Sequence, residues 1–172
     1  MTVLLPEADA TVLARRAEIV AVLRRLVSAD AVIDDVARMR PYESDALTAY
    51  RQLPLVVVLP ETTLQVAAVL RWCHENGVRV VPRGAGTSLS GGALPLGDAV
   101  LLVLSKFSRI LEIDIEDRLA VVQSGVANLA ISAAAEPHGL YYAPDPSSQI
   151  ACSIGGNVAE NSGGVHCLKY GL

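Results

Sequence analysis

Apolar and polar residues recur with different periods along the chain, and these periods predict where helices and strands lie. Over residues 10–28 apolar side chains stand three or four positions apart among charged ones, which predicts an amphipathic helix. The apolar positions of this helix are Leu13, Ala17, Val20 and Leu23. Residues 39–52 show no regular period and are expected to form a loop or linker.

A strand, a helix and a second strand are predicted next. The short apolar run at residues 55–59 lies between two prolines and is typical of a buried strand. Thr62 and Gln65 have the spacing of a capping box at a helix start, and Asn76-Gly77 suits a helix end. The second strand is predicted at residues 78–81. The inner face of the helix is expected to consist of Val66, Ala67, Leu70 and Cys73.

A different pattern follows the glycine-dense stretch at residues 83–97. Residues 99–104 form another apolar strand, whereas residues 111–115 alternate between apolar and acidic side chains, as in a half-exposed strand. Residues 119–123 are expected to return antiparallel to it, and residues 128–135 to form a helix. The predicted fold class is therefore α+β, with a small α/β subdomain followed by a subdomain with a mixed or antiparallel sheet.

Composition excludes several classes of protein. The net charge of −4 over 172 residues gives no electrostatic footprint for nucleic acid. No uncharged apolar run approaches the length of a transmembrane helix, and the first 25 residues are too charged for a secretory signal. The three cysteines, Cys73, Cys152 and Cys167, cannot all pair, which favours a reduced, cytoplasmic protein.

The first glycine cluster, residues 82–92, directly follows a predicted strand. Glycines let a backbone approach a ligand closely, and successive N–H groups in such a loop can hold a diphosphate. Three known phosphate or nucleophile motifs fail here, because Leu89, Ser90 and Gly92 stand where a dinucleotide fingerprint, a nucleophile elbow and a P-loop need other residues. The alternative is a glycine-rich surface loop without a ligand.

The second cluster covers residues 144–149 and 152–164 and is rich in glycine, serine and asparagine. A flat ring system or a diphosphate could lie against such a surface. Asn157 and Asn161 are four positions apart, so both amides are expected to face one side of a helical turn. The alternative is a tightly packed turn region with helix caps.

Other polar residues remain open to more than one interpretation. The pairs Cys73-His74 and His166-Cys167 do not provide the three or four convergent ligands of a metal site, so no metal is predicted. His166 either lies near a bound ligand or has no such role. Asp145, between two prolines, is either catalytic or stabilises a turn, and the turn is favoured.

The ordered set of motifs resembles the FAD-binding domain of the vanillyl-alcohol oxidase/p-cresol methylhydroxylase (PCMH) superfamily. Within it the likeness is greatest to the FAD-linked 2-hydroxy-acid dehydrogenase branch, which includes the FAD subunits of glycolate oxidases. The motifs are Pro82-Arg83-Gly84-Ala85-Gly86-Thr87-Ser88 with Gly91-Gly92, Pro144-Asp145-Pro146-Ser147, residues 154–164, and Lys169-Tyr170-Gly171.

The resemblance implies FAD as cofactor, bound non-covalently because Thr87 stands where some relatives carry a histidine that is covalently linked to the flavin. It assigns residues around the first loop to the pyrophosphate and the others to the flavin, the ribityl chain and the second side of the cofactor. The residues implied are Pro82, Arg83, Gly84, Ala85, Gly86, Thr87, Ser88, Gly91, Gly92, Pro144, Asp145, Ser147, Ser153, Gly155, Gly156, Asn157, Ala159, Asn161 and Gly164.

The resemblance also implies oxidation of a small 2-hydroxy acid, of the glycolate or D-lactate type, by hydride transfer to flavin. An iron–sulfur or other electron-transfer subunit is the expected partner, with the protein cytoplasmic or peripheral to the inner membrane through such subunits. A helical segment over residues 1–40 and a C-terminally incomplete FAD domain over residues 41–172 are expected, so the chain is interpreted as a fragment, inactive by itself, without catalytic residues. The alternatives are a flavin- or nucleotide-binding module without catalysis, a cell-wall precursor reductase of the same flavin-domain ancestry, and a phosphate-binding hydrolase.

Overall fold

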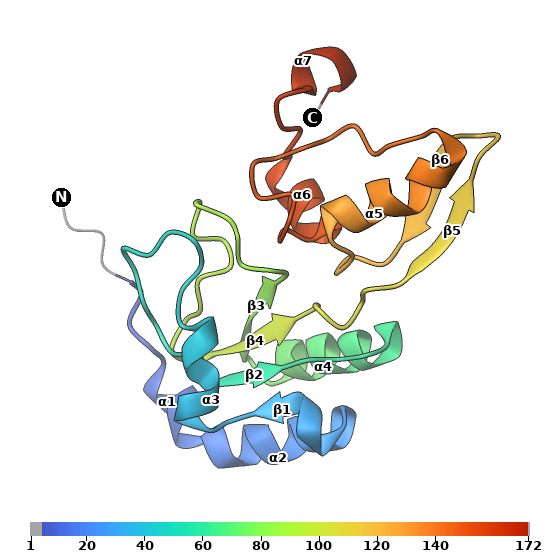
Figure 1. The fold of residues 1–172 in the computed structure, drawn as a ribbon. Coiled ribbons are helices and arrows are strands. Elements are labelled where there is room, and N and C mark those ends of the chain that lie inside the picture. The colour runs from blue at the N-terminus through green and yellow to red at the C-terminus, as the bar shows by residue number, and fades with distance from the viewer. Residues whose placement is uncertain (1–4, 172) are drawn as a thin grey trace. The chain divides into compact units, whose positions relative to one another are not determined.

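The computed structural model describes residues 5–171 and divides them into two compact units, which are considered separately (Figure 1). The first unit comprises the described residues up to Arg83 together with Ser88–Val103. The second comprises Gly84–Thr87 together with the described residues from Leu104 onward. The first glycine cluster is therefore divided, because residues 84–87 pack with residues that lie far along the chain.

The first unit is built on a four-stranded sheet of β1 (Val32–Ile33), β2 (Val56–Val58), β4 (Ala99–Val103) and β3 (Arg79–Arg83), in that order. Strands β2, β4 and β3 run parallel, and β1 is antiparallel to β2. Every residue of β2 and β4 is buried, as expected for central strands covered on both faces. The strands predicted at residues 55–59, 78–81 and 99–104 are confirmed, whereas β1 was not predicted.

Helices of the first unit cover this sheet. They are α1 (Ala10–Ala14), α2 (Arg16–Leu26), α3 (Val36–Met39) and α4 (Thr63–Glu75), with the 3₁₀ turns η1 (Ala29–Ala31) and η2 (Arg40–Tyr42). Helix α2 contacts β1 and α4, and α4 contacts β3 (Figure 1). The single helix predicted over residues 10–28 is interrupted at Arg15, and α3 and η2 occupy part of the segment expected to be irregular.

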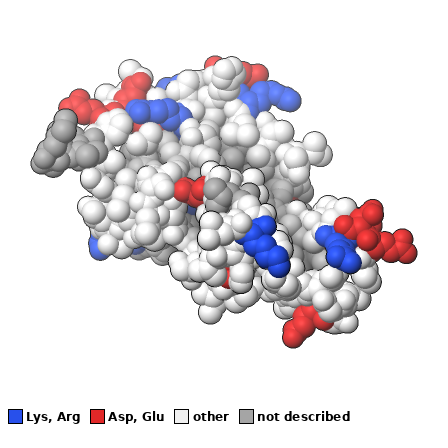
Figure 2. Space-filling model, turned by 90° about the horizontal axis from the view of Figure 1, so that it is seen from above, with Lys and Arg blue, Asp and Glu red and all other residues white. Residues whose placement is uncertain are grey.

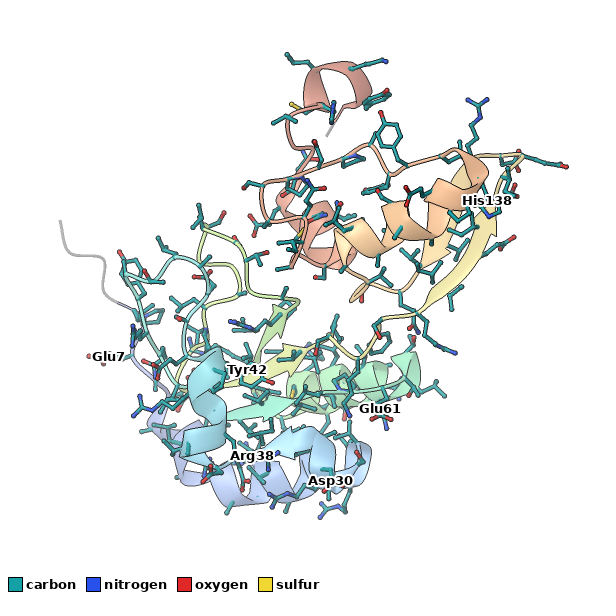
Figure 3. All side chains as sticks on the ribbon, viewed as in Figure 1. Glu7, Asp30, Arg38, Tyr42, Glu61 and His138 are labelled. Atoms are coloured by element: carbon teal, nitrogen blue, oxygen red, sulfur yellow. The ribbon has the colours of Figure 1, made fainter. Side chains whose placement is uncertain are left out.

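The Thr62 cap of α4 is confirmed, although Gln65 returns its bond to Glu61 rather than to Thr62 as in a capping box, and the predicted inner face is wrong in part. Thr62 Oγ1 accepts a hydrogen bond from the Gln65 N–H at 3.2 Å, and Gln65 Oε1 accepts from the N–H of Glu61 at 2.8 Å (Glu61 is labelled in Figure 3). The buried side chains of the helix are Val69 and Cys73, whereas Leu70 is 44% exposed. The buried face of the helix is therefore shifted by about one residue from the expected face.

The second unit carries an antiparallel hairpin of β5 (Ile110–Asp114) and β6 (Leu119–Val122), which confirms the predicted pairing. Arg118, the turn residue just before β6, has a positive φ of 55°. Helix α5 (Asn128–Ala135) has the predicted bounds and continues into the 3₁₀ turn η3 (Glu136–His138). Two short helices complete the described part of this unit, α6 (Ile154–Glu160) and α7 (Cys167–Tyr170).

Of the helices within residues 5–171, none has both the length and the apolar character needed to cross a bilayer. On the face drawn in Figure 2, the described lysine and arginine side chains form small separate groups rather than one continuous basic patch.

Candidate functional site

Arg83, at the end of β3, is buried, and its side chain bonds to the backbone of the protein. Its guanidinium Nη1 donates to the carbonyls of Ser44 at 2.9 Å and Ala93 at 3.2 Å. Its Cζ lies 5.8 Å from the ring centroid of Tyr42, which is labelled in Figure 3. Burial lowers the pKa of Arg83, although the nearby carboxylate of Asp45 opposes that shift. The side chain therefore joins Ala93, beyond the glycine cluster, to the segment around residue 44.

The backbone of residues 84–87 has the features of an anion-binding loop. Gly86 has φ +73°, a conformation that glycine adopts without strain. Among the described residues, no hydrogen bond is made by the backbone N–H groups of Ala85, Gly86 and Thr87. Three consecutive donors without a partner among the described residues, with a left-handed glycine at their centre, form the kind of concave surface that binds anions.

The same loop packs against the second glycine cluster. A Cβ added at Gly84 would clash with the hydroxyl of Ser153. A larger residue at position 84 would therefore force the Ser153 hydroxyl to turn away. The structure thus brings Gly84 and Ser153 together, although they lie 69 positions apart in the chain (153 − 84).

Two buried polar side chains beside this contact have no partner. Ser153 and Asn157 are each 6% exposed, and neither Ser153 Oγ nor Asn157 Nδ2 makes a hydrogen bond among the described residues. A buried donor without a partner costs about 1–3 kcal/mol. Such groups in a folded protein call for an explanation, and a bound ligand is one.

The start of α6 has fewer free donors than the loop at residues 84–87. The N–H of Ile154 donates to the Val126 carbonyl, and that of Gly155 donates to the Ser124 carbonyl, both at 2.8 Å. Asn161 follows the last turn of α6 with φ 57° and is exposed, whereas Asn157 is buried. The prediction that the two asparagine amides share one helical face is therefore wrong, because the helix ends between them.

The segment at residues 144–147 is fixed to the residues that follow α6. The Asp145 N–H donates to the Gly163 carbonyl at 3.2 Å. The Asp145 carboxylate accepts from the His166 N–H at 3.3 Å and lies 2.8 Å from His166 Nδ1. Gly164 has φ +75°, and a Cβ there would clash with Asp145. These contacts support the turn-stabilising interpretation of Asp145.

The remaining residues of the first cluster belong to the first unit. Gly91 has φ +78°, and a Cβ there would lie 3.9 Å from Leu47. Pro82, Ser88 and Gly92 also group with the first unit. Their assignment to a cofactor remains a prediction.

Sequence reasoning missed a pocket in the second unit. It has a volume of about 290 Å³ and lies between the hairpin, α5 and the segment at residues 140–143. None of the predicted cofactor residues lines it. Tyr141 and Tyr170 are among its lining residues. Their hydroxyls are 3.1 Å apart, and Lys169 Nζ lies 4.9 Å from the Tyr170 ring centroid.

Residues 54–172 match the family described as FAD binding domain. The chain belongs to this family. The resemblance inferred from the motifs and the α+β fold class are therefore confirmed, and FAD is the family's cofactor.

Several curated proteins are similar to this chain over most of its length. The chain is 58% identical over 168 residues to the glycolate oxidase subunit GlcD of Escherichia coli K12, a match that covers 98% of this chain and 32% of the relative. It is 44% identical to GlcD of Bacillus subtilis, with 76% and 28% covered. It is 38% identical to the D-lactate dehydrogenase of Anaerostipes hadrus, with 86% and 30% covered. The chain thus spans about a third of the length of these relatives.

Solved structures agree on the fold. Alkyldihydroxyacetonephosphate synthase matches with a TM-score of 0.79 at 22% identity, covering 90% of this chain and 34% of that one. p-Cresol methylhydroxylase matches with a TM-score of 0.65 at 23% identity, covering 83% and 29%. At these identities the likeness concerns the fold alone.

Proposed function

We propose that the chain binds FAD non-covalently and that the second unit supplies a phosphate-binding part of this site. The observation that carries the proposal is the row of three N–H groups at residues 85–87, beside two buried polar side chains, none of which has a hydrogen-bond partner within residues 5–171. Phosphate oxygens accept several hydrogen bonds at once and satisfy such donors. The residues present therefore fit a dinucleotide cofactor.

The proposed contacts of the second unit come from three segments. The loop at residues 84–87 donates backbone hydrogen bonds to phosphate, and Ser153 and Asn157 add a hydroxyl and an amide that are already desolvated. The segment at residues 144–147 forms a wall held in place by Asp145. The proposed set is Gly84, Ala85, Gly86, Thr87, Pro144, Asp145, Ser147, Ser153, Gly155, Gly156, Asn157, Ala159, Asn161 and Gly164.

We further propose that the full activity is oxidation of a small 2-hydroxy acid. When bound, the flavin accepts the hydride equivalent, while the protein holds and orients it. The names of the relatives, glycolate oxidase subunit and D-lactate dehydrogenase, support this substrate class. Because the first of these is named a subunit, we propose an electron-transfer protein as partner, with the complex cytoplasmic or peripheral to the inner membrane.

The binding proposal is tested by titrating the 172-residue chain with FAD and following flavin fluorescence and visible absorbance. Gly86→Ala is compared with Gly139→Ala, because Gly139 has a similar φ of +70° in the same unit, with nothing within 4 Å of an added Cβ. Both variants place a side chain in the left-handed region, at about 1–2 kcal/mol. We expect only Gly86→Ala to weaken FAD binding, by about tenfold or more.

Ser153→Ala is a second test variant, for which both the stability of the cofactor-free chain and the FAD affinity are measured. Removing a buried hydroxyl without a partner is expected to leave the stability of the cofactor-free chain unchanged or raised. The same change is expected to weaken FAD binding. A wild-type chain that folds and ignores FAD would overturn the proposed function, and equal FAD affinity in all the variants would remove these residues from the site.

A further inference from the structure

Asn128, which the motif analysis did not single out, connects two segments of the proposed site. It is 1% exposed and occupies the first position of α5. Its backbone N–H donates to the Cys152 carbonyl at 3.1 Å, and its side-chain Nδ2 donates to the Pro144 carbonyl at 2.9 Å. One residue therefore holds the segment before Ser153 and the segment at residues 144–147.

The residues just before Asn128 contact only one of these two segments, the one at residues 153–155. The stretch at residues 124–127 runs beside residues 153–155, through the Ala127–Ser153 bridge and the hydrogen bonds to the Val126 and Ser124 carbonyls. Within residues 124–128, Asn128 is the residue for which the described structure shows a hydrogen bond to the segment at 144–147. Its side chain therefore sets the spacing between the two segments.

The segment at residues 144–147 depends on such outside support. Pro144 and Pro146 have no backbone N–H, so the segment has few donors of its own. On one side Asp145 attaches it to Gly163 and His166. On the other side the amide of Asn128 holds the Pro144 carbonyl.

Stability alone does not explain an asparagine at this position. Its Oδ1 is buried and has no partner among the described residues, so the asparagine carries a desolvation penalty beside the hydrogen bond that its Nδ2 makes to Pro144. An asparagine with one satisfied and one unsatisfied polar atom, between two segments of the proposed site, is suited to hold their spacing.

We propose that Asn128 is a positioning residue of the FAD site, acting through Pro144 and Cys152 rather than by touching the cofactor. This inference rests on the proposed function. Loss of the amide frees one side of the segment at residues 144–147 while the sheet of the first unit is untouched. FAD binding is then weakened because the binding geometry must be restored at each binding event.

The test compares Asn128→Ala with Ser132→Ala, one turn further along α5. Ser132 is a matched control, because its Oγ also connects the helix to a downstream segment, accepting from the Tyr142 N–H at 3.1 Å. We expect Asn128→Ala to weaken FAD binding by about tenfold, and Ser132→Ala to change it by less than about threefold. Thermal melting of the cofactor-free chains shows whether both variants are similarly folded.

Two further measurements separate positioning from general destabilisation. In Asn128→Ala the N–H of Asp145, which donates to Gly163, is expected to exchange with solvent faster, while exchange in β2 and β4 is unchanged. The visible absorption band of the bound flavin is expected to differ from that of the wild type. Asn128→Ser is measured in parallel, so that the comparison stands even if the alanine variant does not fold.

The outcomes distinguish this inference from the function on which it rests. A wild-type chain without FAD affinity contradicts the proposed function. A wild type that binds FAD, with Asn128→Ala and Asn128→Ser equal to it in affinity and flavin spectrum, contradicts the positioning role. Equal weakening in Asn128→Ala and Ser132→Ala also contradicts it, since the effect would then belong to α5 as a whole.

Discussion

The three thiols differ sharply in their surroundings, and this difference predicts their reactivity. Cys73 is buried within α4, Cys152 is buried before α6, and Cys167 at the start of α7 is partly exposed. Only the thiolate is an effective nucleophile, and burial raises the pKa of Cys73 from 9.0 to about 11. We expect an alkylating reagent at neutral pH to modify Cys167 first, as measured by peptide mass spectrometry. Faster labelling of Cys73 would show that α4 opens readily.

The raised pKa of Cys73 also predicts a pH dependence of stability. Because the folded protein favours the neutral thiol, this contribution is fully present below the unfolded pKa of 9.0 and is lost as the pH rises toward 11. The loss is expected to reach at most about 2–3 kcal/mol. Denaturant unfolding at several alkaline pH values should therefore show a steeper decline for the wild type than for Cys73→Ala. Parallel declines would assign the effect to other groups.

The phenol of Tyr170 is predicted to ionise unusually easily. Its pKa is lowered first by the hydrogen bond from Tyr141 and then by the one from Lys169. Tyr141→Phe and Lys169→Met are each expected to raise the pKa of Tyr170, as followed by NMR titration of labelled tyrosine rings. Tyr142 is an internal control, because its own pKa is raised mainly by burial and its titration should not change. An unchanged Tyr170 in both variants would mean that the two hydroxyls do not interact in solution.

At the scale of elements, strands and caps were predictable where a local pattern determines them. The apolar runs of β2 and β4 and the Thr62 cap of α4 are examples. Strand β1 was missed because it comprises only two residues and is defined by its pairing with β2. The inner face of α4 was misplaced because the neighbouring elements, not periodicity alone, decide which of Val69 and Leu70 is buried.

The candidate site, too, could be predicted only where a local sequence pattern marks it. Its glycine-rich segments are visible in the sequence, but the contact between Gly84 and Ser153 depends on long-range packing. Arg83 was expected near the pyrophosphate, and only the structure shows its guanidinium bonded to two backbone carbonyls. Asn128 lies outside every recognisable motif. Its two hydrogen-bond partners, Pro144 and Cys152, lie 16 and 24 positions further along the chain, so only the structure reveals them.

The buried sheet of the first unit is expected to dominate that unit's stability. Leu101 in β4 is fully buried in a cluster with Ile33, Met39 and Val57. Leu101→Ala is therefore expected to lower the free energy of unfolding by about 3 kcal/mol, through lost burial and the cavity left behind. Leu64→Ala on α4 is the control, because Leu64 is 83% exposed and its replacement should change stability by less than about 0.5 kcal/mol. Similar values for both in denaturant unfolding would contradict the assigned core.

At the scale of the whole chain, apolar residues are distributed unequally between the two units. Most of the buried apolar residues lie in the first unit, and the second unit contributes Phe107, Val126, Ile131, Ala135 and Cys152. Its exposed large apolar side chains are Leu111, Ile115, Leu119, Val121, Leu129, Tyr141, Ile150, Val158, Val165, Leu168 and Tyr170. The second unit therefore gains much less from burial than the first.

This imbalance predicts that the two units open separately. Hydrogen exchange is expected to be slowest in β2 and β4 and faster throughout the hairpin β5–β6 and α5, since little buried surface opposes their opening. If FAD binds as proposed, a hundredfold excess over its dissociation constant adds about 2.7 kcal/mol to the stability of the state that binds it. That gain should appear as slower exchange at residues 84–87, 144–147 and 153–157, with the first unit's β2 and β4 as the internal reference. Equal protection of both units without cofactor would contradict the unequal burial, and protection by FAD confined to β2 and β4 would place the cofactor elsewhere.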